Sequence, residues 1–174
     1  MLSDKIQDAI NRQINSEMFS AHLYLSMAAY FETLSLTGFA HWMRLQFEEE
    51  TAHALKLFDY VNDRDGRVAL QAIEQPPIEF DSPHSVMRMA LEHERLVTDM
   101  INNLYALAVA ERDYPSQVLL EWFVSEQVEE EKTVRDIVDH MDIIGSDGTG
   151  LLIIDQRLGD RVAEEAGAED AAPE

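Results

Sequence analysis

The sequence predicts an all-α protein: a four-helix bundle with one long crossover between the second and third helices, followed by a short fifth helix. Glycine and proline are few, no segment alternates strictly between apolar and polar residues, and four long segments carry apolar residues at helical spacing. The chain has 174 residues, of which 46% are hydrophobic, so it is long enough to bury one sizeable core.

The first two predicted helices form one hairpin. The first begins after an N-cap at Ser3 and ends near Leu34, and the second runs from about Gly38 to about Asp65, before Gly66. The connection between them is short, so we expect the two helices to be antiparallel.

The last two long helices form a second hairpin. Residues 81–83, Asp-Ser-Pro, predict the start of the third helix, because capping residues precede a proline in the first turn. This helix ends near Asp113, and the fourth helix runs from Pro115 to Gly145. The short connection again predicts antiparallel packing.

A long segment, residues 66–81, joins the two hairpins. Extended, it would span about 50 Å, more than the second helix, which is about 42 Å long, so the second and third helices can run parallel. We expect one domain over residues 1–160, with the bundle at about 3–145 and an apolar fifth helix at about 150–159. Residues 161–174 are acidic and lack aromatic residues, which predicts a disordered tail.

Each long helix carries one glutamate near its midpoint, on a face that is otherwise apolar. A bundle packed on these faces would bury four carboxylates in one layer, and even a paired buried carboxylate costs several kcal/mol to desolvate. Four negative charges balance two divalent metal ions, so the pattern predicts a two-metal site. The four stripes are Ile10, Ile14, Glu17, Ala21, Tyr24, Ala28 and Phe31; Met43, Phe47, Glu50, Ala54, Leu57 and Val61; Met87, Ala90, Glu94, Val97, Ile101 and Leu104; and Phe123, Gln127, Glu130, Val134, Ile137 and Met141.

One short motif adds a nitrogen ligand to the carboxylates. Glu50 and His53 form the only Glu-x-x-His of the chain, and this spacing places both side chains on one helical face. Gln127 lies three residues before Glu130 and can share its site; a hydrogen-bonding role in the core is the alternative. Oxygen ligands with a single imidazole suit iron or manganese, and zinc also binds such sites.

Charge and composition exclude several classes of function. The formal net charge of −21 favours cations and makes nucleic acid an unexpected partner. Cysteine is absent, which excludes disulfides, thiolate zinc sites and cysteine-ligated iron–sulfur centres. The N-terminus does not resemble a signal peptide and no apolar run approaches ~20 residues, so we expect no membrane association and a cytoplasmic location.

These motifs resemble those of bacterial-type non-haem ferritins, over roughly residues 2–160. The resemblance is carried by Glu17 with Tyr24 seven residues later, by the run Glu49-Glu50-Thr-Ala-His53, by Glu94, and by residues 122–132 of the fourth helix. It implies a di-iron centre with site A at Glu17, Glu50 and His53, site B at Glu50, Glu94 and Glu130 with Gln127 close by, Glu50 bridging both irons, Tyr24 beside the centre, and a third iron site at Glu49, Glu126, Glu129 and Glu130.

The resemblance also implies a function. Such a protein is a ferroxidase that oxidises Fe(II) with O2 or peroxide and stores Fe(III) as a hydrated oxide mineral inside a shell of 24 identical subunits. The alternative is a structural cage that binds metal only to stabilise its bundle. The complete ligand set, including Tyr24, favours the enzyme.

Departures from the patterns of two related families limit which family properties are expected of this chain. Haem is not expected, because Thr51 follows Glu50 where bacterioferritins have a methionine, and the fourth helix has no histidine before His140. Animal ferritins line their three-fold channel with acids, whereas residues 117–121 are Gln-Val-Leu-Leu-Glu, so an iron-entry route at the three-fold axis is not carried over. Two further interpretations concern single residues: Trp122 is expected in the core, and the Asp81-x-x-His84 pair is expected to act as a helix cap.

Overall fold

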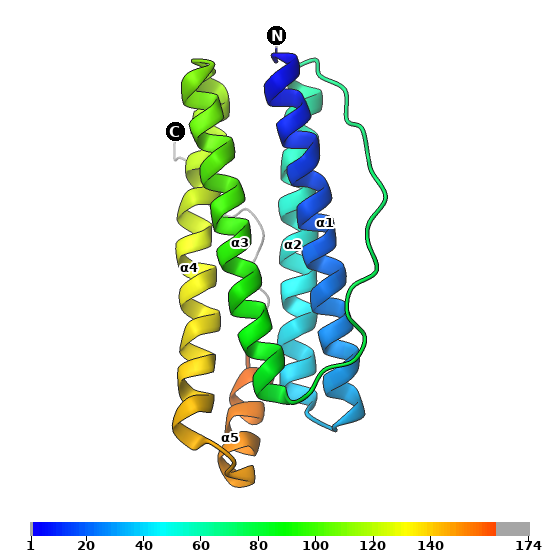
Figure 1. Cartoon of the computed structure of the whole chain (residues 1–174), viewed down its shortest axis with the longest axis vertical. Coiled ribbons are helices and arrows are strands. Elements are labelled where there is room, and N and C mark those ends of the chain that lie inside the picture. Colours follow the sequence, from blue (N-terminus) through cyan, green and yellow to red (C-terminus); the bar gives the residue numbers. More distant parts are fainter. Residues whose placement is uncertain (1, 163–174) are drawn as a thin grey trace, which may run out of the picture.

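The computed structural model describes residues 2–162, which form five helices and no strand. Four long helices lie side by side as a bundle, and the short fifth helix packs at the end where the fourth helix finishes (Figure 1). The predicted all-α bundle is therefore confirmed. The helices are α1 (Asp4–Thr33), α2 (Thr37–Asp63), α3 (Pro83–Ala110), α4 (Tyr114–Ile144) and α5 (Gly148–Gly159).

The connection from α2 to α3 runs the length of the bundle along the outer side of α1 (Figure 1), so that α2 and α3 are parallel as predicted. Side chains of α1 hold this connection in place. The Asn11 amide donates to the carbonyl of Arg67 at 3.1 Å and accepts from the Ala69 N–H at 3.0 Å, and the Ser26 hydroxyl donates to the Pro77 carbonyl at 2.5 Å.

Side-chain caps set the helix starts close to the predicted positions. Ser3 accepts from the N–H of Ile6 at 3.4 Å at the start of α1. Ser82 and Ser85 form a reciprocal capping box at the start of α3, with N···O distances of 3.1 and 3.0 Å. His84 was wrongly interpreted as part of this cap; its Nε2 instead lies 2.8 Å from Asp142 Oδ1 on α4.

Helices α1, α2 and α3 are each followed, two residues after their last residue, by a non-glycine residue whose backbone lies in the left-handed region. Ser35, Asp65 and Arg112 have φ of 58°, 55° and 55°. At α2 the left-handed residue is thus Asp65 and not Gly66, whose N–H donates to the Val61 carbonyl at 2.8 Å. These hydrogen bonds satisfy carbonyls of the last turn and help to hold a conformation that costs about 1–2 kcal/mol without glycine.

The apolar stripes form the core as predicted, and the layer of glutamates divides it. Every stripe residue is buried except Phe47, which is partly buried. One apolar cluster on one side of the layer includes Phe31 and Met43, and the second cluster on the other side includes Ile10 and Leu57. The expectation that Trp122 lies in the core is wrong, because 37% of its surface is exposed. The polar layer thus lies between two apolar clusters.

Helix α5 docks on the start of α2. A side-chain carbon on Gly38 would lie 1.7 Å from the Asp155 carbonyl oxygen, so the two backbones touch there, and the Phe39 N–H donates to Asp155 Oδ1 at 2.9 Å. Of its apolar residues only Ile154 is buried. Within residues 2–162, no helix combines the length and apolar character needed to cross a bilayer. Most of the predicted acidic tail, residues 163–174, lies outside the described residues.

Replacing Ser82 by alanine tests the cap of α3. Loss of the capping box is expected to lower the free energy of unfolding by about 1 kcal/mol, measured as a lower midpoint in urea unfolding followed by circular dichroism. Ser125→Ala is the control, because Ser125 is exposed within α4 and alanine suits a helix interior. Equal midpoints for Ser82→Ala and Ser125→Ala would contradict the capping role.

Candidate metal centre

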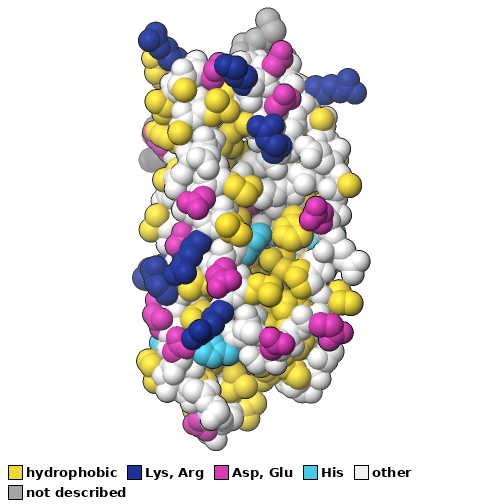
Figure 2. Space-filling view, viewed as in Figure 1, with side chains coloured by type: hydrophobic (Ala, Val, Ile, Leu, Met, Phe, Trp, Pro, Cys, Tyr) yellow, Lys and Arg dark blue, Asp and Glu magenta, His cyan; other side chains and the backbone are white. Residues whose placement is uncertain are grey.

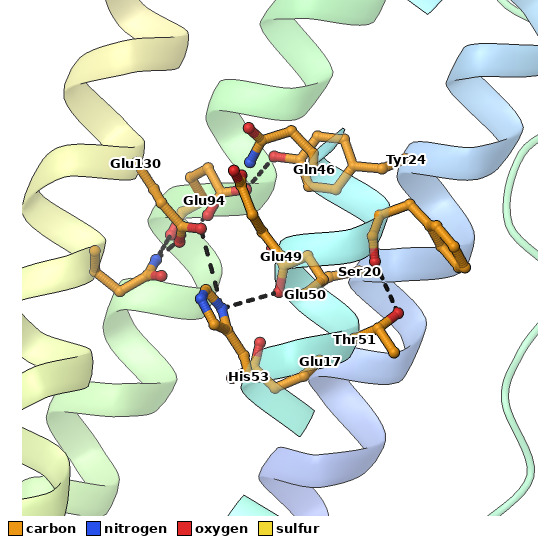
Figure 3. Close-up of polar contacts among 12 residues, drawn as sticks. Glu17, Ser20, Tyr24, Gln46, Glu49, Glu50, Thr51, His53, Glu94 and Glu130 are labelled. Carbon is orange, nitrogen blue, oxygen red and sulfur yellow. Dashed lines mark hydrogen bonds and ion pairs between the residues drawn. The ribbon is translucent and has the colours of Figure 1, made fainter. Parts of the chain in front are cut away.

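The four midpoint glutamates meet in one buried layer. Glu17 comes from α1, Glu50 from α2, Glu94 from α3 and Glu130 from α4, and the carboxylates point toward one another between the helices (Figure 3). All four are buried because they lie on the apolar faces that the bundle packs together. The fold thus gathers acidic groups that repel one another.

Two overlapping sets of ligand atoms lie within this layer. One oxygen each of Glu17 and Glu50 and one ring nitrogen of His53 lie within 4.8 Å of one another, as do oxygens of Glu50, Glu94 and Glu130. Glu50 belongs to both sets. His53 Nδ1 lies 3.6 Å from Glu50 Oε2 and 4.0 Å from Glu130 Oε1, so the imidazole lies beside both groups. The structure brings together the residues predicted for sites A and B.

Several of these carboxylate oxygens have no donor around them. Within residues 2–162, the buried atoms Glu17 Oε2, Glu50 Oε1, Glu50 Oε2 and Glu130 Oε2 have no hydrogen-bond partner. Buried polar atoms are almost always paired in folded proteins. Unpaired oxygens from three helices, aimed at one place, fit cations that bind there.

The pKa values of the acids rise because the layer is buried. Burial, followed by the charges of the neighbouring carboxylates, raises the pKa of Glu50 and Glu130 well above the ordinary range. Burial raises the pKa of Glu17 too, and raises that of Glu94 to about 7. The metal-free centre therefore holds protons that incoming cations must replace.

Burial has the opposite effect on His53. It lowers the pKa of the imidazole to about 4, with the nearby Lys56 charge acting in the same direction. His53 is neutral at pH 7 and keeps a lone pair for a metal ion. Its ring contacts Phe123 and the partly exposed Trp122 edge to face, with centroids 5.8 and 5.3 Å away, which orients it toward the acids.

A second layer of side chains orients the ligands. The Tyr24 hydroxyl donates to Glu94 Oε1, and the Gln127 amide donates to Glu94 Oε2 at 3.3 Å and to the Glu94 carbonyl at 3.2 Å. The burial of Tyr24, together with the acids around it, raises its pKa well above 10. Tyr24 and Gln127, both predicted near the centre, thus hold one ligand from two sides.

Sequence reasoning missed two members of this layer. The Gln13 amide donates to Glu17 Oε1 at 2.8 Å, and Thr98 accepts from Gln127 at 3.3 Å while it donates to Glu131 at 2.6 Å. Gln13 stands four residues before Glu17, a spacing that could have revealed it. Thr98 stands four residues after Glu94, on the same face of its helix.

The residues predicted for a third site line a single cavity on the other side of Glu130. Glu49 and Glu126, Glu129 and Glu130 bound a space of about 40 Å³ between α2 and α4. Oxygens of Glu126 and Glu130 also lie within 4.8 Å of a His53 nitrogen, a grouping that was not predicted. Arg161 is a further unpredicted member of this cavity. The cavity lined by the residues predicted for the third site is thus adjacent to the buried layer, and Glu130 belongs to both.

Glu94→Gln tests the buried acids through pH. A glutamate whose native pKa is raised to about 7 stabilises the fold while it is protonated, and this contribution is lost as pH rises from 4.5 through 7. Glutamine stays neutral, so the metal-free variant should gain thermal stability over wild type as pH rises, with no advantage near pH 4.5 and the full advantage above pH 7.

Unfolding midpoints by circular dichroism between pH 4.5 and 8 measure this difference. Glu92→Gln is the matched control on the same helix, because Glu92 is exposed. A pH-independent difference between Glu94→Gln and wild type, or the same profile in Glu92→Gln, would contradict a raised pKa at Glu94.

Comparison with known proteins places this centre in a family. Residues 7–144 match the family model described as the ferritin-like domain. The bacterial non-heme ferritin of Bacteroides fragilis is 44% identical over 92% of this chain and 100% of the relative, and that of Campylobacter jejuni is 41% identical over 91% and 95%.

Solved structures agree with the sequence relatives. The open pore ferritin from the archaeon Archaeoglobus fulgidus superposes with a TM-score of 0.92 at 48% identity, and the comparison covers 93% of this chain and all of that one. An engineered closed form of the same ferritin gives a TM-score of 0.93 at 47% identity. The fold, the buried carboxylate layer and these relatives together establish that the chain belongs to the ferritin family.

Proposed function

We propose that this protein stores iron and is a ferroxidase, with its reaction centre at the buried carboxylate layer. The observation that carries the proposal is the pair of ligand sets that share Glu50 inside one subunit. Two ferrous ions bound there would be bridged by one carboxylate, and the neutral His53 would complete the first set. Carboxylate and imidazole ligands suit iron.

The centre favours oxidation because its anionic ligands stabilise the ferric ion more than the ferrous ion. Two ferrous ions give up two electrons, and O2 takes these with two protons to become H2O2; peroxide is the alternative oxidant. The carboxylic acids of the metal-free layer release protons as the cations bind, since their pKa values are raised by burial. Two apolar clusters around the layer keep bulk water away.

Tyr24 and Gln127 are positioning residues in this scheme. Both donate hydrogen bonds to Glu94, which keeps that carboxylate turned toward Glu50 and Glu130. In the metal-free centre the tyrosine is protonated, because its pKa is raised well above 10, so it is a hydrogen-bond donor to Glu94 before cations bind. A fixed ligand orientation holds two metal ions in one geometry before the reaction begins.

The adjacent cavity offers a route for ferric iron out of the centre. Glu130 belongs both to the layer and to the cavity, so a cation can pass between them while it keeps one ligand. Glu49, Glu126 and Glu129 would hold a third iron on its way to the mineral.

A structural cage that binds metal only for stability is the second candidate. Both ligand sets and Tyr24 are present in this chain, which favours oxidation over a structural role. Adding ferrous salt in air separates the two candidates, because oxidation gives an amber colour within seconds and simple binding does not.

We infer that 24 copies assemble into a hollow shell. Figure 2 shows apolar side chains gathered on the face that α1 and α3 present. The exposed apolar residues of these two helices include Leu25, Leu96 and Met100. Leu152 and Ile153 of α5 are exposed as well. Exposed apolar surface of this kind is typical of subunit contacts. Of the similar solved structures, one is described as an open pore ferritin and another as a closed form engineered from it by mutagenesis.

Two expected features accompany this proposal. We expect no haem, because the residue after Glu50 is Thr51, whose hydroxyl donates within its own helix to the Phe47 carbonyl at 2.7 Å. A cytoplasmic location remains a prediction.

Glu50→Ala tests the centre directly. Loss of the residue shared by both ligand sets should abolish the fast phase of Fe(II) oxidation, followed by stopped-flow absorbance after two Fe(II) per subunit are added. The fold should persist, because removing a buried carboxylate relieves repulsion in the metal-free protein. Glu48→Ala is the control, since Glu48 is exposed on the same helix. A wild-type fast phase in Glu50→Ala would refute the di-iron assignment.

Assembly is tested by analytical ultracentrifugation. At ordinary salt, the main species should have the mass of 24 subunits of 19.8 kDa. Because each chain carries a net charge of −21, the shell should attract Fe(II), and initial uptake should slow as ionic strength rises. Only monomers and dimers at ordinary salt would contradict the shell.

A further inference from the structure

The positive side chain of Arg161 lines the cavity that is bounded by the residues predicted for the third iron site. Arg161 follows α5, and its guanidinium donates from Nη2 to Glu49 Oε1 at 2.8 Å and from Nη1 to Gln46 Oε1. The guanidinium carbon also lies 5.5 Å from the centre of the Trp42 ring. Only 22% of the arginine side chain is exposed. Three residues of α2 thus hold one cationic group over the acidic cavity.

The backbone at Arg161 is anchored separately from its side chain. The Arg161 carbonyl oxygen lies 2.9 Å from His41 Nε2, and its N–H donates to the Leu158 carbonyl at 3.3 Å. Behind it, α5 is fixed to α2 by the close approach at Gly38. The docking of α5 therefore places the guanidinium, because Arg161 lies two residues after the end of a helix whose backbone touches α2 at Gly38.

The cavity beneath the guanidinium suits one more cation. It is bounded by four glutamates and holds about 40 Å³, which is room for one or two water molecules or a metal ion. Glu130 Oε2 has no hydrogen-bond partner within residues 2–162, although Glu130 is only 8% exposed. Glu130 lines this cavity as well as the buried layer, so its unpaired oxygen is also available to a cation held in the cavity.

We propose that Arg161 is a built-in competitor of the third metal ion. The inference rests on the proposed function, since it assigns a regulatory partner to the third site. Glu49 Oε1 already accepts from the guanidinium, so a divalent ion that binds through this oxygen displaces Arg161, and one that binds through Oε2 alone shares the carboxylate with a positive charge. While it is bound, the arginine neutralises part of the acidic cluster and keeps the affinity for the third ion low.

The chemistry of arginine fits this role. The guanidinium keeps its charge at every physiological pH, so Arg161 remains a cationic competitor over that whole range. It is held by the side chains of Gln46, Glu49 and Trp42, and its flexible stem lets it leave without moving α5. Release of Arg161 would then mark the moment when the third site fills.

Zinc titration of the assembled, metal-free protein tests this competition without any redox reaction. Isothermal titration calorimetry should resolve two tight Zn²⁺ equivalents per chain at the buried layer and a weaker third. Arg161→Gln should tighten the third equivalent by on the order of tenfold, since a charge-assisted hydrogen bond no longer opposes it, and should leave the first two unchanged. Arg161→Lys keeps the charge without the fork and should fall in between.

Two control variants complete the experiment. Arg157→Gln removes the same charge from an exposed position four residues earlier and should leave the third equivalent as in wild type. Glu49→Gln should weaken the third equivalent, alone and combined with Arg161→Gln, which assigns that equivalent to the cavity.

Several results would overturn the proposal. These are an unchanged or weaker third equivalent in Arg161→Gln, an equal gain in Arg157→Gln, or no third equivalent in any variant. Loss of the first two equivalents in wild type would instead count against the proposed di-metal function. Circular dichroism and gel filtration of each variant verify that the fold and the assembly persist.

Discussion

Repulsion among four buried carboxylates is the constraint on which this structure depends. The acids lie where an ordinary helical bundle places leucine or alanine, and burial raises their pKa values. Such a layer destabilises the metal-free fold, because charged groups lose water and gain like-charged neighbours. Cations reverse both effects. Metal binding is therefore the natural complement of this core.

The rest of the core compensates for that layer. Apolar clusters on each side of it join all four long helices, and their burial stabilises the bundle whether or not the acids are ionised. The cap at the start of α3 and the hydrogen bond from α1 to the α2–α3 connection help to hold the helices in place. A rigid frame of this kind lets the ligands keep their geometry although they repel one another.

Helix α2 serves both sides of the centre. Glu50 faces the buried layer, while its neighbour Glu49 lies about 100° around the helix and faces the cavity next to α4. Gln46, one turn earlier, contacts Arg161 at the same cavity. One helix thus connects the proposed reaction centre with the proposed third site and, through Arg161, with the position of α5.

The sequence by itself determined the helices, their buried faces and the four glutamates that share a layer, because helical periodicity is a local property. The proximity of Glu50 and His53 could also be predicted from the sequence, since they stand three residues apart on one helix. The tertiary structure alone decided that Arg161 lies against Glu49, 112 residues earlier, and that Trp122 lies at the surface beside His53. No period in the sequence encodes such contacts. The first follows from the close approach of α5 to Gly38, and the second from the contact between α4 and α2 at His53. Both depend on packing between segments that are distant in the sequence.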